Sequence, residues 1–306
     1  MQSARAMRTE GVDMLVSVPN RSWADMFGDY LALTKPGIVL WLMITALCAM
    51  AVAAKGIPPL VTAGATLVGL ALSAGGAHAV NMWYDRDIDQ VMDRTKTRPV
   101  AAGRVSARNA LMFGVIAGLV AFGWLVLMVN WLTAWTCLSG YLTYVFVYTV
   151  WLKRRSPQNI VIGGAAGAVP PMVGWAAVTD HLGLTAWLMF SIIFLWTPPH
   201  FWALALYKQD DYRRANIPMM PIIRGKRATA IQTVIYTGLV ILASLTLWRV
   251  AHLSWEYFGV AVVAGAWFMV YQVRVLVDND PKTRWAKKAF GFSLIYIALL
   301  FVAMAI

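Results

Sequence analysis

Nine apolar runs, each close to 20 residues long, constrain this chain more than any other feature of its sequence. An α-helix needs about 20 mostly apolar residues to cross the hydrocarbon layer of a bilayer. The runs cover residues 37–55, 59–81, 109–129, 131–151, 158–178, 183–207, 228–249, 257–274 and 289–306. We therefore predict an all-α, polytopic membrane protein, a bundle of about nine transmembrane helices around a central cavity.

Composition and cysteine usage agree with a membrane protein. Hydrophobic residues make up 60% of the chain and charged residues 13%, whereas soluble domains are about half apolar and about a quarter charged. Cys48 and Cys137 lie inside apolar runs without CxxC spacing, so we expect neither a disulfide framework nor a zinc site. We predict an N-terminal tail, residues 1–28, without the apolar core of a signal peptide, followed by one intramembrane domain, residues 29–306.

Basic residues are distributed so unevenly that they indicate an orientation. If the nine runs cross the membrane in turn, 24 of the 26 Lys and Arg residues fall on one side, and only Lys55 and Arg249 fall on the other. The positive-inside rule places the basic side, with the N-terminal tail, in the cytoplasm. Membrane topology thus explains the net charge of +12. Because the basic residues follow the topology, we expect the lipid bilayer and not nucleic acid as a partner.

Aspartates crowd the cytoplasmic end of the second run. Asn81, Asp85 and Asp89 are four residues apart, so they stack on one face of a helix. Asp93 could extend this column, whereas Asp87 points away from it. Stacked carboxylates repel one another unless a cation bridges them, and hard oxygen ligands suit Mg²⁺. The alternative is a solvated helix end whose aspartates pair with the nearby basic residues Arg86, Arg94 and Lys96.

Polar groups also gather at the cytoplasmic end of the sixth run. His200, Tyr207 and Asp211 are separated by seven and four residues, which places them on one face of a helix. Such a face indicates a polar cavity rather than lipid contact, although a hydrogen-bonded structural role for His200 stays open. Proline pairs at 170–171 and 198–199 would kink the fifth and sixth runs, and we expect them to widen a pocket between those helices.

A short internal repeat links the two polar clusters. The first cluster is followed by Pro99-x-x-x-Gly103 and the third run, and the second by Pro221-x-x-x-Gly225 and the seventh. Each half of the chain thus presents an acidic helix end, a basic loop and a Pro/Gly turn. Paired repeats facing one central site explain this pattern, and chance similarity is the alternative.

These residues resemble those of a known family. The segment 81–89, followed by 94–99, is similar to the first aspartate-rich motif, NxxxDxxxD, of the UbiA superfamily of membrane prenyltransferases. Three later stretches, 155–167, 196–205 and 211–219, resemble the branch of that superfamily that farnesylates heme.

The resemblance extends from about Asp29 to the C-terminus and has three departures. Ala215 stands four residues after Asp211, where other branches complete a second aspartate motif. Asn216 occupies a position where glycine is expected, and His78 one that is commonly small or apolar. A second metal site is therefore less well defined than the first.

The resemblance implies a reaction, a cofactor and partners. A farnesyl group would pass from farnesyl diphosphate to a vinyl group of protoheme IX (heme B), giving heme O and diphosphate, in the bacterial inner membrane. Heme A synthase and terminal oxidase assembly factors are the implied protein partners. Mg²⁺ would be held by the catalytic residues Asn81, Asp85, Asp89 and Asp211.

Substrate-binding residues follow from the same resemblance. Basic side chains are expected to clamp the diphosphate, and aromatic faces to stabilise an allylic cation. His200 would ligate the heme iron or orient the porphyrin, and His78, one turn from Asn81, is a second candidate. The basic set is Arg94, Lys96, Arg98 and Lys208, and the aromatic set is Tyr84, Trp202 and Tyr207.

Two other functions compete with this one. A prenyltransferase with a quinone-type aromatic acceptor would share the metal motif, and only the later stretches argue against it. A transporter would also have many spans, kinked helices and intramembrane carboxylates. A transporter should place its acidic residues near the bilayer midplane, however, and here they cluster at one face.

Overall fold

The computed structural model describes residues 22–278 and 283–306, and every regular element within these ranges is a helix. Most of the predicted N-terminal tail lies outside the described residues. Its predicted boundary at residue 28 falls inside a helix, α1 (Trp23–Leu33), which Ser22 caps through a hydrogen bond from the Asp25 backbone N–H. The domain boundary therefore stays a prediction.

All nine predicted crossings coincide with helical segments. Among the described residues, eight single helices are long and apolar enough to cross a membrane. The ninth crossing is made of two consecutive helices, α6 (Trp131–Leu142) and η1 (Thr143–Leu152). The eight are α2 (Pro36–Ala54), α3 (Leu60–Tyr84), α5 (Ala107–Met128), α7 (Asn159–Thr179), α8 (Leu184–Tyr207), α11 (Gly225–Ala251), α12 (Trp255–Val277) and α13 (Arg284–Met304). The protein is an all-α, multi-pass membrane protein.

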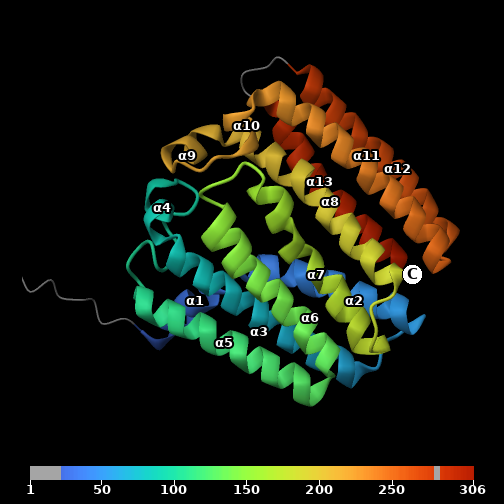
Figure 1. Ribbon diagram of the computed structural model, residues 1–306, viewed down its shortest axis with the longest axis horizontal. Coiled ribbons are helices and arrows are strands. Elements are labelled where there is room, and N and C mark those ends of the chain that lie inside the picture. The colour runs from blue at the N-terminus through green and yellow to red at the C-terminus, as the bar shows by residue number, and fades with distance from the viewer. Residues whose placement is uncertain (1–21, 279–282) are drawn as a thin grey trace, which may run out of the picture.

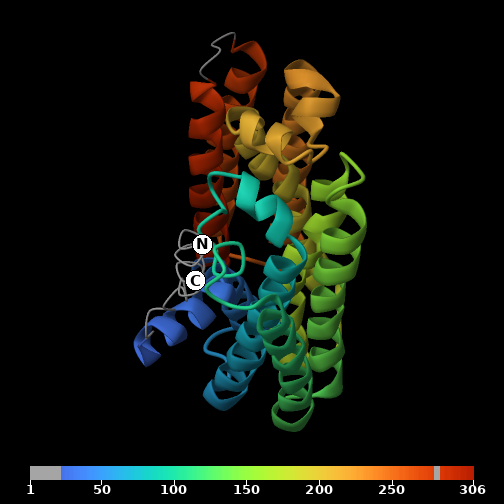
Figure 2. The same cartoon turned by 90° about the vertical axis from the view of Figure 1, so that its left-hand side faces the viewer.

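Three short helices gather at one end of this bundle. They are α4 (Arg86–Val91), α9 (Gln209–Arg214) and α10 (Met220–Ile223), and both views show α4 near α9 and α10 (Figures 1 and 2). Both acidic clusters lie at this end, because α4 follows α3 directly and α9 follows α8. Apolar side chains from α4, α8, α9 and α10 pack into one cluster beneath them.

The two halves of the chain repeat the same order of elements, as the sequence pattern indicated. In the first half, α3 leads into the short acidic helix α4, a loop and α5. In the second, α8 leads into the short acidic helix α9, a loop with α10, and α11. Gly103 in the first loop and Gly225, the first residue of α11, have φ of +73° and +79°, a left-handed conformation that a side chain disfavours.

Small residues allow the long helices to approach closely. Gly76 of α3 faces Gly114 of α5 so tightly that a β-carbon on either would lie 2.7 Å from the other's carbonyl oxygen. Small residues at such crossings are what stabilise helix pairs in lipid, where the hydrophobic effect gives no preference for helix contact over lipid contact. The proline pairs at 170–171 and 198–199 lie inside α7 and α8 without ending either helix. Cys48 and Cys137 are buried free thiols.

Gly174 gives a test of this packing. On Gly174 of α7, an added β-carbon would overlap the backbone carbonyl of Ala46 on α2. We expect Gly174→Ala to destabilise the fold by at least about 2 kcal/mol, because backbone cannot move aside as a flexible side chain can. Gly167, on the same helix, has no atom within 4 Å of its added β-carbon. Gly167→Ala should leave the melting temperature in detergent unchanged or slightly higher, and equal losses in both variants would contradict this.

Candidate active site

The first acidic cluster lies where α3 ends. The helix stops at Tyr84, Asp85 adopts a non-helical conformation with φ −87° and ψ 4°, and α4 begins at Arg86. The prediction that Asn81, Asp85 and Asp89 share one continuous helix is therefore wrong, because Asn81 lies on α3 and Asp89 on α4. Asn81 and Asp85 nevertheless remain together, since Asn81 Nδ2 donates to Asp85 Oδ2 at 2.7 Å.

Each member of the predicted column is buried and bonded to a basic side chain from another segment. Asn81, Asp85 and Asp89 are 2%, 0% and 1% exposed. Their partners are Lys35 Nζ at 2.9 Å from Asn81 Oδ1, Lys153 Nζ on Asp85, and Arg98 Nη1 at 2.9 and 2.8 Å from the two Asp89 oxygens. The three side chains do not form a solvated helix end.

Asp93 pairs with Lys96 as that alternative describes, and Asp87 is exposed but pairs with Arg154, which the alternative did not name. Asp87 points away from the column, is exposed, and receives two hydrogen bonds from Arg154, which hold the pKa of its carboxyl below the usual value. Asp93 is exposed and bonds Lys96 at 2.9 Å. Arg154 also lies 4.9 Å from the ring centre of Tyr84 and 3.5 Å from Asp85 Oδ1.

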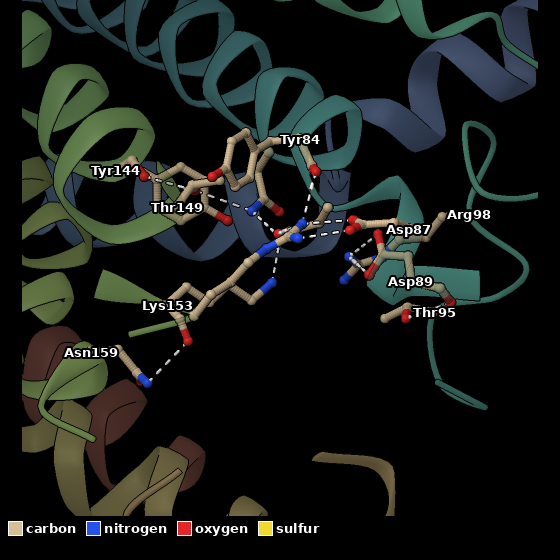
Figure 3. A network of polar contacts seen from close by, with 12 residues as sticks. Tyr84, Asp87, Asp89, Thr95, Arg98, Tyr144, Thr149, Lys153 and Asn159 are labelled. Carbon is tan, nitrogen blue, oxygen red and sulfur yellow. Dashed lines mark hydrogen bonds and ion pairs between the residues drawn. The ribbon is translucent and has the colours of Figure 1, made fainter. Parts of the chain in front are cut away.

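A π-helix, η1, completes the site from the opposite side (Figure 3). Thr149 Oγ1 accepts from Asn81 Nδ2 at 3.1 Å, the Tyr144 hydroxyl lies 3.3 Å from Lys35 Nζ, and Lys153 reaches Asp85. Tyr144 and Thr149 are five residues apart, which on an α-helix would separate them by about 140°. Hydrogen bonds to the fifth residue, such as Lys153 N to Tyr148 O at 2.9 Å, widen the turn and bring these side chains to one face.

Four of these contact residues were not predicted as site residues. Lys35 and Lys153 counted only toward the topology signal, and nothing in the local sequence distinguishes Tyr144 or Thr149 from other residues of an apolar run. Lys35 has the left-handed φ of +54° immediately before Pro36, which turns the chain between α1 and α2. Burial and the nearby charges of Arg98 and Lys153 lower the pKa of Lys35 well below its usual value.

The second acidic cluster lies on a separate helix from His200. Helix α8 ends at Tyr207 and Asp211 lies on α9, so the predicted single face through Asp211 is wrong. The Asp211 side chain is bonded by Arg214, whose Nη2 also lies 2.6 Å from Asp93 Oδ2. Arg214 thus joins the two acidic clusters.

Other candidate residues surround this junction or pack beneath it. Arg94 lies beside Tyr212 of α9. Burial raises the pKa of the Tyr212 hydroxyl, and the positive charge of Arg94 partly offsets that rise. Lys208 is exposed, with Nζ 6.0 Å from the ring centre of Tyr207. Trp202 is fully buried, edge-on to Tyr236, in the cluster that joins α8 to α9 and α10.

The two histidines occupy different settings. His78 Nδ1 lies 2.8 Å from the carbonyl oxygen of Thr34, and the ring packs edge-on against Tyr144. His200 is enclosed by aromatic rings between α8 and α13, and its Nδ1 lies 2.6 Å from Ser293 Oγ. An open hollow of about 500 Å³ lies elsewhere, lined by apolar residues of α1, α2, α3 and α5. The central cavity stays a prediction.

Comparison with known proteins decides the family. Residues 42–298 match the UbiA prenyltransferase family. The chain belongs to the UbiA prenyltransferase family. A curated relative from Symbiobacterium thermophilum, named protoheme IX farnesyltransferase, is 51% identical over 90% of this chain and 92% of its own length. A second relative of the same name, from Roseiflexus sp. (strain RS-1), is 48% identical over 91% of this chain, which spans 52% of that longer protein.

Solved structures share the fold of this UbiA prenyltransferase. A structure described as that of digeranylgeranylglyceryl phosphate synthase aligns over 91% of this chain and 97% of its own with a TM-score of 0.76 at 14% identity. A UbiA homolog from Archaeoglobus fulgidus, bound to DMAPP and Mg²⁺, aligns over 91% and 99% with a TM-score of 0.63 at 16% identity. Family membership makes this chain a prenyltransferase and removes the transporter from consideration.

The donor atoms of this UbiA prenyltransferase fit a divalent ion. Asn81, Asp85 and Asp89 offer hard oxygen donors, which Mg²⁺ prefers and completes with water and substrate phosphate oxygens. Asp85 Oδ1 is buried and accepts no hydrogen bond in the part of the chain that the structure describes. Its nearest partner there is Arg154 Nη2, an ion-pair contact at 3.5 Å. Within those residues, no three His, Cys, Asp or Glu side chains converge on one point. The candidate set is therefore two carboxylates and one amide.

Proposed function

We propose that this chain transfers a farnesyl group from farnesyl diphosphate to a vinyl group of protoheme IX, with water supplying a hydroxyl group, giving heme O and diphosphate. The observation that carries the proposal is the 51% identity, over 90% of the chain, to a protein named protoheme IX farnesyltransferase. The buried Asn81, Asp85 and Asp89 donors with their basic partners support it.

Cleavage of the allylic C–O bond requires neutralisation of the charge that develops on the leaving diphosphate. When bound by Asn81, Asp85 and Asp89, Mg²⁺ supplies Lewis-acid stabilisation of phosphate oxygens. Lys35, Lys153 and Arg98 each contact one of those three side chains. An anion bound at the same donors therefore lies beside three basic side chains.

Exposed basic residues and half-buried tyrosines lie at the boundary of the site. Arg94, Lys96 and Lys208 are exposed at the end of the bundle where a diphosphate would enter, and we assign them to phosphate binding. Tyr84 and Tyr207 are half-buried, and their ring faces would stabilise the allylic cation. Trp202 supports this arrangement by packing in the apolar cluster below.

Asp211 would bind a second ion. Its contact with Arg214, which also holds Asp93, brings its carboxylate to the same end of the bundle as the first set. A divalent ion at Asp211 would replace Arg214 as the partner of that carboxylate.

The distribution of Lys and Arg residues indicates the orientation in the membrane, and the product of the reaction indicates the protein partners. The basic loops and the N-terminus face the cytoplasm of a bacterium, in its inner membrane, because the positive charges of the chain concentrate at the acidic end. Heme A synthase or terminal oxidase assembly factors would receive the product.

Incubation of purified protein with heme B, farnesyl diphosphate and Mg²⁺ tests the proposal directly. We expect mass spectrometry to find a product equal to heme B plus one farnesyl group and one hydroxyl group. A parallel reaction supplies a quinone-type aromatic acceptor instead of heme. Prenylation of the aromatic acceptor with unmodified heme would assign the chain to the other branch of the family.

Removal of divalent ions is a second prediction. With excess EDTA, we expect diphosphate release to fall at least about 100-fold, because Lys35, Lys153 and Arg98 alone do not replace a divalent charge on the leaving group. Added Mg²⁺ in excess over EDTA should restore the rate. Full activity in EDTA, with metal analysis showing no bound ion, would contradict the metal assignment.

A further inference from the structure

His200 lies in a pocket of aromatic rings. Trp196 and Phe290 stack on its ring at centroid distances of 4.3 and 4.6 Å with interplanar angles of 18° and 23°, and Phe201 packs edge-on at 4.9 Å. The residue is only 6% exposed. Stacking on this scale holds the plane of the imidazole, so its two nitrogens point in fixed directions.

Ser293 of α13 determines which nitrogen carries the proton. Ser293 Oγ donates its single proton to the carbonyl oxygen of Phe290 at 2.6 Å. In its 2.6 Å contact with His200 Nδ1, the same oxygen must then accept, so Nδ1 is protonated. A neutral imidazole with a protonated Nδ1 has its lone pair on Nε2. The only hydrogen bond of the His200 ring to a described residue is the one at Nδ1.

We propose that Ser293 is a positioning residue that fixes His200 as the Nδ1–H tautomer and thereby presents Nε2 to the iron of the heme substrate. The inference rests on the proposed function, since heme B is the iron compound that the reaction consumes. Metal-ligating histidines commonly donate the proton of their other nitrogen to a nearby acceptor, which sets the tautomer and raises the basicity of the ligand. Ser293 supplies that acceptor here.

The depth of His200 suits an apolar macrocycle. His200 is seven residues before the end of α8 at Tyr207, which corresponds to about 10 Å along the helix. A porphyrin ligated there would lie deeper in the membrane than a diphosphate held near Asp85 and Asp89, among aromatic rings instead of charged groups. This separation places the charged leaving group and the apolar acceptor in surroundings that suit each of them.

Heme binding without the prenyl donor tests this assignment. Ferric heme B is titrated into the purified full-length protein, and the Soret band and electron paramagnetic resonance spectrum report ligation of the iron. We expect His200→Gly to lose the histidine-ligated spectrum and added imidazole to restore it. Ser293→Ala should lower heme affinity about 10-fold and reduce the histidine-ligated fraction.

A retained backbone contact and a matched control variant distinguish a positioning role of Ser293 from a role in folding. The variant keeps the backbone carbonyl of residue 293, which accepts from Trp196 Nε1 at 2.9 Å, so the α8–α13 contact is retained. Ser244→Ala is the matched control, because Ser244 is also fully buried and bonds its own helix, at Val240 O, but contacts no histidine. Ser244→Ala should bind heme like the wild type, and Ser293→Ala should bind farnesyl diphosphate with Mg²⁺ like the wild type.

Several results would overturn the inference. A wild-type spectrum in His200→Gly excludes His200 as the iron ligand, and equal heme affinities for Ser293→Ala and Ser244→Ala exclude the role of Ser293. In either case, heme O production by the wild type leaves the proposed function standing. Absence of both heme binding and product in the wild type would instead reject the proposed function, and this inference with it.

Discussion

Asp85→Asn is expected to lower the rate of diphosphate release roughly 10³-fold, which corresponds to about 4 kcal/mol of transition-state stabilisation. Asp85 is fully buried, and it lies between Asn81 and the basic residues Lys153 and Arg154. The substitution keeps the shape of the side chain but removes the negative charge that would hold a divalent ion. The measurement is diphosphate release from farnesyl diphosphate at saturating Mg²⁺ and heme.

Asp87→Asn is the matched control for this variant. Asp87 is two residues away and its side chain is 61% exposed, with Arg154 as its partner. Exposed ion pairs contribute little to stability, so we expect Asp87→Asn to retain activity within about threefold of the wild type. Similar losses in both variants would show that the acidic helix end acts through its general charge, not through Asp85.

Lys153→Met is expected to lower kcat/KM for farnesyl diphosphate roughly 10²-fold, mainly through a higher KM. Its ammonium group contacts Asp85, so it lies next to any diphosphate bound there. Arg155 follows two residues later and is exposed, and Arg155→Gln should leave both kcat and KM within about threefold of the wild type. A loss of thermal stability in Lys153→Met with an unchanged KM would mean that Lys153 only neutralises a buried carboxylate.

The membrane crossings could be predicted because hydropathy reports them directly. The first predicted run, 37–55, corresponds to α2 at Pro36–Ala54, and the other runs agree similarly. The largest shift is in the last run, predicted from 289, whose helix α13 already begins at Arg284. Basic residues in its first turn lie outside the apolar run, so hydropathy excludes them although the helix includes them.

The helix breaks at Asp85 and Lys208 could not be predicted from spacing. A four-residue repeat extrapolates a continuous helix, and nothing in the sequence between Asn81 and Asp89 ends one. Both breaks occur where a long helix meets a short acidic one at the same end of the bundle.

One departure from the family pattern has a structural reason. Asn216 has a left-handed φ of +51°, which asparagine tolerates better than most residues other than glycine.

The oxygen donors of the site and the basic residue Arg98 were predictable, whereas the other two basic partners, Lys35 and Lys153, were not. Asn81, Asp85 and Asp89 lie within nine residues, so their spacing indicates proximity. Lys35 is 46 residues from Asn81, and Lys153 is 68 residues from Asp85. Only the tertiary fold brings these residues together. The π-helix adds a second obstacle, because analysis of periodicity assumes 3.6 residues per turn, whereas Tyr144, Thr149 and Lys153 share a face through a wider turn.

A crystal structure with Mn²⁺ and a non-hydrolysable farnesyl diphosphate analogue would test the metal-binding role of this site most directly. We expect an anomalous peak at ligand distance from oxygens of Asn81, Asp85 and Asp89, with a phosphate oxygen completing the coordination and Lys153 turned toward the diphosphate. A diphosphate bound elsewhere, with Lys35, Lys153 and Arg98 still on those three side chains and no metal among them, would contradict it.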